Sequence, residues 1–328
     1  MEERRAKVAA ALAAAAERTL GGHVKIENLG PLSGGASADT WAFDADCQGE
    51  RHELILRLAP PQKDHIRLDR TTEAGLLTQA GNAGVPVPKV LFQVEEEDEL
   101  GSGYAMERIA GETIARKILR DEQYAEARER MARQCGEILY RIHSMDTAKL
   151  PPLKEQPAAT LIDELYPMYK AFGQELPVFE LTFRWLRDHL PEEGRELRFV
   201  HGDFRNGNFI VGPEGIRAVL DWELAHLGEP MEDLGWICVN SWRFGNIDLP
   251  VGGFGLREDL FAGYEDAGGG AVDPEEVRFW EVFGTLKWGL ITILQAYTHL
   301  GGAKRSVELA AIGRRTSETE IDLVNLLR

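Results

Sequence analysis

The chain lacks the features that would mark a disulfide-rich, zinc-binding or nucleic-acid-binding protein. Its 328 residues include only three cysteines, Cys47, Cys135 and Cys238, and no two of them form a C-x-x-C pair. Structural disulfides and a zinc site are therefore not expected, and a reducing, cytoplasmic location is the default. The formal net charge is −17, so the chain has no excess of Lys and Arg to neutralise phosphates, and no nucleic-acid partner is expected.

Long apolar segments are missing as well. Residues 283–300 form the most apolar stretch, but Lys287 and Gln295 interrupt it and make it a poor membrane span. The alanine-rich N-terminus follows Glu2 and Glu3, which do not suit a signal peptide, and its composition predicts a surface helix. We therefore expect no membrane partner.

The first third of the chain is rich in strand-like segments. Two of them, 24–29 and 40–43, enclose a loop of small residues that lets backbone N–H groups approach a phosphate closely. The loop residues are Ser33, Gly34, Gly35, Ala36 and Ser37. No G-K-[ST] follows, so this is not a Walker A loop, and a plain hairpin turn is the commoner explanation of such a composition.

Two charged residues in this region have a structural and a functional interpretation. Arg57 lies in the expected strand 53–58. This strand is either at the edge of the sheet, with the Arg57 side chain reaching solvent, or it presents Arg57 as a cation to the nucleotide phosphates. Glu73 lies in the helix expected over 70–79, either on a solvated face or opposite Arg57 in an orienting ion pair. The sequence does not decide between these interpretations.

The pattern changes after the strand that contains Met106 and Glu107. Apolar periodicity predicts helices at 121–144, 161–172, 179–190, 229–243, 257–266, 274–300 and 304–327. This change predicts a boundary between a β-rich and a helical lobe, with a Gly-containing connection between them.

The middle of the chain carries the strongest chemical signal. Apolar runs at 208–211 and 216–220 flank a Gly-Pro-Glu-Gly turn, which predicts a β-hairpin. Antiparallel pairing places Asp221 beside Asn208, and Asp203 lies a few residues upstream. A carboxamide and two carboxylates at one end of a hairpin offer hard oxygen ligands for Mg²⁺ and a general base.

The order of these features resembles the aminoglycoside phosphotransferase family, whose fold is related to that of protein kinases. More narrowly, the chain is similar to the phosphotransferases akin to the kinase domain attached to some acyl-CoA dehydrogenases. The motif His201-Gly202-Asp203-x-x-x-x-Asn208, followed by Asp221-Trp222-Glu223, carries the resemblance, which covers most of the chain.

The resemblance implies an α+β, bilobal protein-kinase-like fold. Its N-terminal lobe is an antiparallel β-sheet with a helix, and its C-terminal lobe is mainly helical. The implied division is an ATP-binding lobe at residues 1–105, a hinge at 106–112, and a catalytic and substrate-binding lobe at 113–328.

The resemblance also implies the catalytic and metal-binding roles. Asp203 would accept the proton of the acceptor hydroxyl or orient that hydroxyl, and Arg205 would touch the transferred phosphate. Asn208 and Asp221 would bind Mg²⁺. Asp233 would hold the catalytic loop from within the core.

The remaining matches concern the nucleotide. Residues Ser33–Ser37 would cover the phosphates of ATP, Arg57 with Glu73 would contact them, and backbone groups of Met106 and Glu107 would meet adenine. Here Arg57 replaces the usual lysine, which keeps the charge but changes the shape of the donor. The metal motif ends in Glu223, either a further ligand or a hydrogen-bonding neighbour, and the second is favoured.

The implied activity is transfer of the γ-phosphate of Mg·ATP to a hydroxyl of a small molecule, by a monomer or a homodimer. Antibiotics, sugars, amino alcohols and hydroxyacyl compounds are all acceptors in such enzymes, and fold does not choose among them. Two alternatives stay open. One is a non-catalytic ATP-binding pseudokinase, supported by Arg57, and the other is a metal-dependent hydrolase that uses Asp203, Asp221 and His201.

Overall fold

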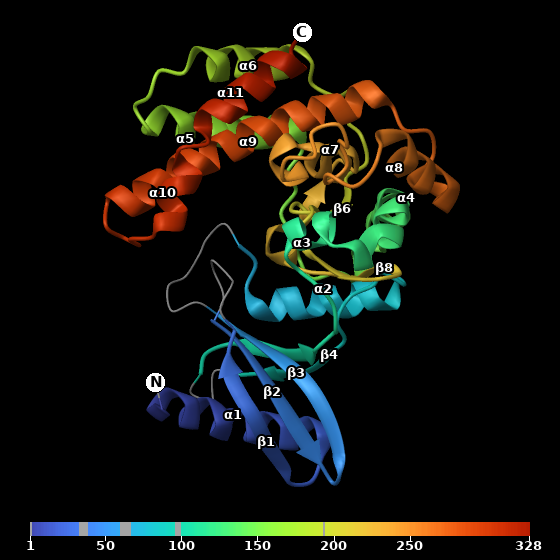
Figure 1. The fold of residues 1–328 in the computed structure, drawn as a ribbon, viewed down its shortest axis with the longest axis vertical. Helices are drawn as coiled ribbons and strands as arrows, with labels where there is room; N and C mark the ends of the chain where they lie inside the picture. The colour runs from blue at the N-terminus through green and yellow to red at the C-terminus, as the bar shows by residue number, and fades with distance from the viewer. Residues whose placement is uncertain (1, 33–38, 60–66, 96–99, 193) are drawn as a thin grey trace.

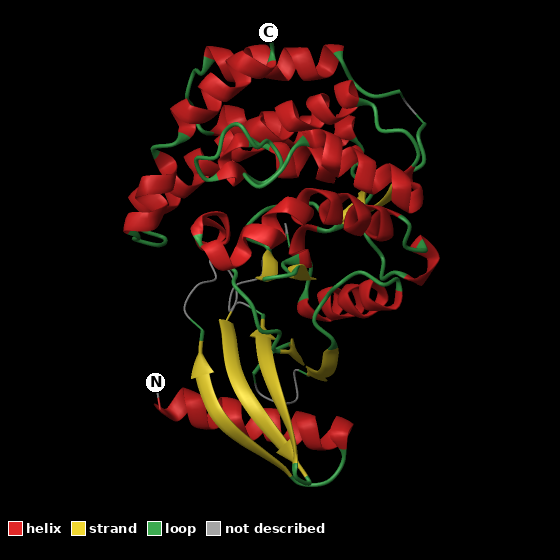
Figure 2. Cartoon of the chain, turned by 45° about the vertical axis from the view of Figure 1, so that its right-hand side comes forward, coloured by secondary structure: helices red, strands yellow, loops and turns green. Residues whose placement is uncertain are grey.

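The computed structural model describes residues 2–32, 39–59, 67–95, 100–192 and 194–328, which form two lobes stacked along the long axis (Figure 1). The strands of the large sheet gather at one end of the molecule and most helices at the other (Figure 2). The predicted antiparallel sheet lobe followed by a mainly helical lobe is confirmed. No helix of the described ranges is long and apolar enough to cross a membrane.

The first lobe is a five-stranded antiparallel sheet in the order β1-β2-β3-β5-β4. The strands are β1 (Val24–Pro31), β2 (Asp39–Cys47), β3 (Glu50–Leu58), β4 (Val90–Val94) and β5 (Gly103–Glu107). Helix α1 (Glu2–Leu20) is not only a surface helix, because Val8, Leu12, Ala15 and Ala16 are buried in one apolar cluster with the strands. Helix α2 (Arg70–Asn82) lies between this sheet and the second lobe (Figure 1).

The second lobe is built from helices around two short sheets. Its α-helices are α3 (Ala115–Arg120), α4 (Ala125–His143), α5 (Ala158–Ala171), α6 (Pro177–Asp188), α7 (Met231–Cys238), α8 (Arg257–Tyr264), α9 (Pro274–Leu300), α10 (Val307–Gly313) and α11 (Thr316–Leu326). The short strands are β6 (Arg198–Val200) paired with β9 (His226–Gly228), and β7 (Phe209–Gly212) paired with β8 (Gly215–Val219).

Two of the predicted helices were wrong in extent. The helix expected over 229–243 ends at Cys238, because Val239 adopts extended backbone (φ −56°, ψ 132°), and a short 3₁₀ turn η5 (Asn240–Arg243) follows. The helix expected over 304–327 divides into α10 and α11 after Gly313, where the chain packs against Ala296 of α9 too closely for a Cβ atom.

The β7–β8 hairpin joins the two lobes. Glu112, in the connection after β5, exchanges backbone hydrogen bonds with Val211 of β7 (both 2.9 Å), and the Val219 N–H of β8 donates to the Pro86 carbonyl before β4 (2.9 Å). Gly111 makes the first contact possible, because a Cβ atom there would meet the Val211 carbonyl oxygen at 2.9 Å. The hairpin is therefore hydrogen-bonded to the connection between the lobes and to the segment before β4.

Candidate active site

A buried carboxylate on α7 holds the loop between β6 and β7. Asp233 accepts hydrogen bonds from the backbone N–H groups of His201 (2.7 Å) and Gly202 (2.9 Å), and its other contact is His143 Nε2 at 3.2 Å. Burial alone would raise the pKa of Asp233, but the hydrogen bond and charge of His143 outweigh it and lower this pKa. Gly202 has φ 76°, and a Cβ atom there would collide with the Leu224 carbonyl oxygen.

His201 is a structural residue of this loop. Its Nδ1 accepts the backbone N–H of Asp203 (3.2 Å), so Nε2 carries the proton and donates to the Leu220 carbonyl (3.1 Å). Burial lowers the pKa of His201, which favours this neutral form. Both ring nitrogens are occupied, so His201 is not available as a metal ligand.

The Asp203 side chain lies at the surface of the loop, with 17% of its area exposed. Its Oδ1 accepts hydrogen bonds from Arg205 Nε (3.0 Å) and Trp236 Nε1 (2.9 Å), and its Oδ2 accepts one from Asn208 Nδ2 (2.7 Å). The Arg205 guanidinium also lies over the ring of Trp242, 4.5 Å from its centroid. Arg205 and Asn208 therefore both lie at the carboxylate of Asp203.

The hairpin brings Asp221 beside Asn208, as predicted from antiparallel pairing. The Leu220 N–H donates to the Asn208 carbonyl (2.8 Å), and Asp221 then turns in the left-handed region (φ 63°, ψ 61°). This backbone is uncommon for a residue other than glycine and is often found at functional sites. Asn208 is buried, whereas 42% of the Asp221 side chain is exposed.

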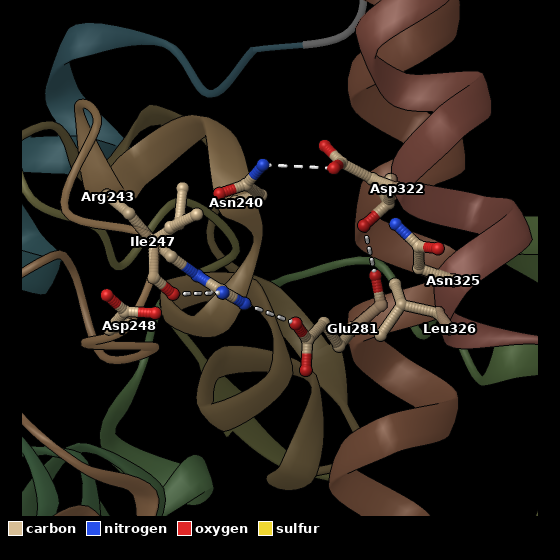
Figure 3. A pocket seen from close by; sticks show the side chains of 9 residues that line it. Asn240, Arg243, Ile247, Asp248, Glu281, Asp322, Asn325 and Leu326 are labelled. Atoms are coloured by element: carbon tan, nitrogen blue, oxygen red, sulfur yellow. Dashed lines mark hydrogen bonds and ion pairs between the residues drawn. The ribbon is translucent and has the colours of Figure 1, made fainter.

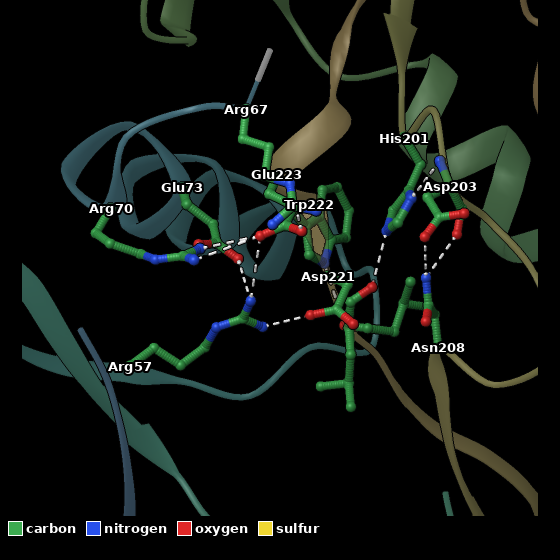
Figure 4. Close-up of polar contacts among 12 residues, drawn as sticks. Arg57, Arg67, Arg70, Glu73, His201, Asp203, Asn208, Asp221, Trp222 and Glu223 are labelled. Carbon is green, nitrogen blue, oxygen red and sulfur yellow. Dashed lines mark hydrogen bonds and ion pairs between the residues drawn. The ribbon is translucent and has the colours of Figure 1, made fainter. Parts of the chain in front are cut away.

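Arg57 binds Asp221 directly. Its Nη1 donates to Asp221 Oδ1 at 2.6 Å, and its Nη2 lies 3.5 Å from Glu73 Oε1 (Figure 4). Desolvation raises the pKa of Asp221, but the charges of Arg57 and Arg205 outweigh it and lower this pKa. The interpretation of β3 as an edge strand was wrong, because β3 lies between β2 and β5 and Arg57 is buried. The solvated-face interpretation of Glu73 was also wrong, because Glu73 is fully buried.

Glu223 belongs to the same ion-pair cluster. Its carboxylate lies 3.3 Å from Arg67 Nε, 3.4 Å from Arg70 Nη2 and 3.7 Å from Arg57 Nη2. Arg70, the first residue of α2, is buried and also pairs with Glu73 in the same helix. Three arginines and three carboxylates (Glu73, Asp221 and Glu223) thus balance one another's charge between α2, β3 and the end of the hairpin (Figure 4).

Of the residues predicted to bind adenine and to cover the phosphates, the structure describes only the first group. Met106 and Glu107 lie at the end of β5, where Met106 pairs with Ile55 and the Glu107 N–H donates to the Lys89 carbonyl (2.9 Å). The loop residues Ser33, Gly34, Gly35, Ala36 and Ser37 lie outside the described ranges.

The sequence did not single out Arg67, Arg70 or Trp236, although all three contact the site. Arg70 stands directly after Asp69, which caps α2 through the Thr72 N–H (2.9 Å), so this position looked like an ordinary helix start. Trp236 follows Asp233 by three residues on a helix, which places both side chains on one face. That spacing was the available signal.

His226 forms a second buried charged group beneath the loop. Its Nδ1 lies 3.0 Å from the Leu224 carbonyl oxygen and its Nε2 3.0 Å from Glu232 Oε2, so both nitrogens face acceptors. Burial would lower the pKa of His226, but the charge of Glu232 and the hydrogen bond to it outweigh burial and raise this pKa, against a smaller opposing effect of Lys287. Both ring nitrogens can donate only when the imidazole is protonated, so this geometry and the raised pKa both favour the imidazolium.

This assignment predicts a pH dependence of folding. A raised pKa in the folded state contributes stability that is complete below the unfolded value of about 6.5 and is lost as pH rises through the folded value, at about 1.4 kcal/mol per pKa unit. We expect the difference in free energy of unfolding between wild type and His226→Gln to shrink from pH 6 to pH 9 in urea titrations. A difference that stays constant over this range would mean that His226 is neutral in the folded protein.

A pocket of about 320 Å³ lies between η5, α9 and α11, and its lining includes none of the candidate site residues described above (Figure 3). Arg243 crosses its wall and pairs with Glu281 (2.8 Å), while Asn240 donates to Asp322 (2.9 Å). Ile247 and Asp248 also line this pocket. In the described ranges, no group of three or more His, Cys, Asp or Glu side chains is arranged to hold a metal ion.

The chain and its fold are similar to several known proteins. The chain is similar to acyl-CoA dehydrogenase family member 10 of Mus musculus, with 32% identity over 174 residues, which are 51% of this chain and 16% of the mouse protein. The chain thus spans only a small part of that relative. Its fold is similar to a putative aminoglycoside phosphotransferase from Ralstonia eutropha JMP134 (TM-score 0.76, 22% identity, 97% of both chains). It is also similar to amicoumacin kinase hAmiN in complex with AMP-PNP and Ca²⁺ (TM-score 0.59, 15% identity, 90% of this chain and 88% of that one).

The family model of the phosphotransferase enzyme family (APH) matches residues 28–280. This match covers most of both lobes, including β3, the β6–β7 loop, the hairpin and α7. The chain therefore belongs to the APH phosphotransferase enzyme family.

Proposed function

We propose that the protein transfers the γ-phosphate of Mg·ATP to a hydroxyl group of a small molecule, with Asp203 as the base. The observation that carries this proposal is the convergence of Asp203, Asn208 and Asp221 at one end of the β7–β8 hairpin, with Arg57 of the other lobe bonded to Asp221 at 2.6 Å. In this proposal, the set would hold an acceptor group, a metal and a phosphate within one site.

In the proposed reaction, the acceptor oxygen attacks the γ-phosphorus while the bond to the β–γ bridging oxygen breaks and ADP leaves. Asp203 takes the hydroxyl proton or orients the hydroxyl in line with that bond. Arg205, held by Asp203 and by the ring of Trp242, offers a cation to the transferred phosphate. These groups are fixed before substrate binds, which reduces the entropy that the reaction must lose.

The residues present fit a divalent ion. Asn208 uses its Nδ2 in bonds to Asp203, and Asp221 uses Oδ1 for Arg57. Within the described ranges, Asn208 Oδ1 and Asp221 Oδ2 accept no hydrogen bond, so one hard oxygen on each residue is available as a ligand. Bound Mg²⁺ would offset the negative charge on the phosphates during transfer.

The nucleotide would lie between the lobes. We propose the hinge at 106–112, which begins with the last two residues of β5, Met106 and Glu107, whose backbone groups would meet adenine. Arg57 would turn from Asp221 to the phosphates once metal occupies Asp221, with Glu73 holding its other side. The complex of amicoumacin kinase, which has a similar fold, with AMP-PNP and Ca²⁺ supports the binding of a nucleotide.

We place the acceptor in the second lobe, against residues 150–179 and 242–255. The pocket between η5, α9 and α11 includes Arg243, Ile247 and Asp248 from the second of these segments. Acceptor identity is tested by screening hydroxylated metabolites and antibiotics for ADP release in the presence of Mg·ATP. Acceptor-dependent ADP release together with a phosphorylated product supports the proposal, and Mg·ATP binding without transfer to any compound favours a pseudokinase.

A further inference from the structure

The hydrogen bonds to Asp203 leave its two carboxylate oxygens in different states. A carboxylate has about four acceptor positions, two on each oxygen. Oδ1 accepts from Trp236 Nε1 (2.9 Å) and Arg205 Nε (3.0 Å), so both of its positions are used. Oδ2 accepts only from Asn208 Nδ2 (2.7 Å), which leaves one position on this oxygen.

Trp236 is the one donor in this set that lies outside the His201–Asn208 motif. It is 4% exposed, and its indole N–H can only donate, so the direction of the hydrogen bond is fixed by the packing of the ring. Asp233, one helical turn earlier, binds the backbone of His201 and Gly202. Helix α7 thus uses one face for two contacts. Asp233 binds the backbone before Asp203, and Trp236 binds the Asp203 carboxylate.

The Lys287 side chain of α9 lies over the indole ring of Trp236. Its ammonium lies 4.9 Å from the centroid of the Trp236 ring, 3.4 Å from the Gly202 carbonyl oxygen and 3.9 Å from Glu232 Oε1. A cation over an indole draws electron density toward the ring face, which makes the N–H a better donor. Lys287 therefore ties α9 to both α7 and the catalytic loop.

We propose that Trp236 is a positioning residue that occupies Oδ1 of Asp203, so that Oδ2 is the oxygen that meets the acceptor hydroxyl. This inference rests on the proposed role of Asp203 as the base. With Oδ1 held by Trp236 and Arg205, the carboxylate cannot rotate about its Cβ–Cγ bond without breaking these two hydrogen bonds and the one from Asn208 Nδ2 to Oδ2. The unused acceptor position on Oδ2 then points in one fixed direction, which is what an in-line attack by the acceptor hydroxyl requires.

The first test observes the hydrogen bond without activity. The chain has seven tryptophans, so an ¹H–¹⁵N spectrum resolves at most seven indole N–H resonances, and the one missing in Trp236→Phe belongs to Trp236. In Asp203→Ala we expect this resonance to move upfield by more than any other indole signal. An unchanged resonance would overturn the inference.

The second test measures hydrolysis of Mg·ATP with water as the acceptor. Trp280→Phe is the matched control, because Trp280 is equally buried and its Nε1 has no hydrogen-bond partner in the part of the chain that the structure describes. We expect Trp236→Phe to lower kcat about tenfold or more with the Kd for Mg·AMP-PNP unchanged, and Trp280→Phe to stay near wild type. In an Asp203→Ala background, Trp236→Phe should have no further effect.

The outcomes separate the inference from the function on which it rests. Hydrolysis by Trp236→Phe at the rate of Trp280→Phe overturns the inference, and so does an effect of Trp236→Phe on the residual rate of Asp203→Ala. In either case, loss of most hydrolysis in Asp203→Ala would still support the proposed base. An Asp203→Ala variant as active as wild type contradicts the proposed base and the inference together.

Discussion

Asp203→Asn is expected to lower turnover about a thousandfold while Mg·ATP affinity stays within about twofold of wild type. The amide keeps one oxygen but cannot take a proton, and it replaces an acceptor with an N–H₂ group that faces either Asn208 Nδ2 or the donors Trp236 and Arg205. The measurement is single-turnover phosphate transfer beside nucleotide titration by calorimetry.

The control for this variant is Asp188→Asn, an exposed carboxylate at the end of α6 that lies 3.8 Å from Arg184 Nε. It makes the same chemical change away from the site and should leave turnover unchanged. If Asp203→Asn turned over like Asp188→Asn, Asp203 would not be the base.

Asp221→Ala should have the opposite pattern, weakening Mg·ATP binding about a hundredfold, or by roughly 3 kcal/mol. The variant removes a proposed metal ligand and the 2.6 Å partner of Arg57. Glu214→Ala is the matched control, because Glu214 is an exposed residue in the turn of the same hairpin and pairs only with the half-buried Arg217 in the described contacts. Mg·ATP binding to Asp221→Ala with wild-type affinity would show that the metal is held elsewhere.

The Arg57–Asp221 contact also predicts that metal and nucleotide bind together. A divalent ion that arrives alone must displace a buried guanidinium from Asp221, and a nucleotide that arrives alone must draw Arg57 away from that carboxylate. When both bind, the phosphates take Arg57 and the metal takes Asp221, so neither charge is left unpaired. Each ligand should therefore raise the affinity for the other.

The sequence predicted those parts of the site that depend on local pairing. The two apolar runs and the turn between them specified the hairpin, and antiparallel register alone placed Asp221 beside Asn208. The loop with Asp203 followed because only a few residues separate it from Asn208.

Contacts between distant segments were not predictable in the same way. Arg57 is separated from Asp221 by 164 residues and Arg70 from Glu223 by 153, and no periodicity specifies which arginine meets which carboxylate. Arg57 is buried beside Glu73 because β3 lies in the interior of the sheet, and this position depends on the strand order. Trp236 was visible as an aromatic residue on a helix, but its hydrogen bond depends on how α7 packs beneath the loop.

The most direct test of the account is thermal unfolding with four additions: none, Mg²⁺ alone, ATP with EDTA, and Mg·ATP. At about 100 times its Kd, Mg·ATP should stabilise the protein by about 2.7 kcal/mol, which corresponds to a rise in Tm of roughly 4 °C, and each component alone should give less. No rise with Mg·ATP, or the same rise with ATP and EDTA, would contradict a site in which Asp221 and Asn208 bind a metal together with nucleotide.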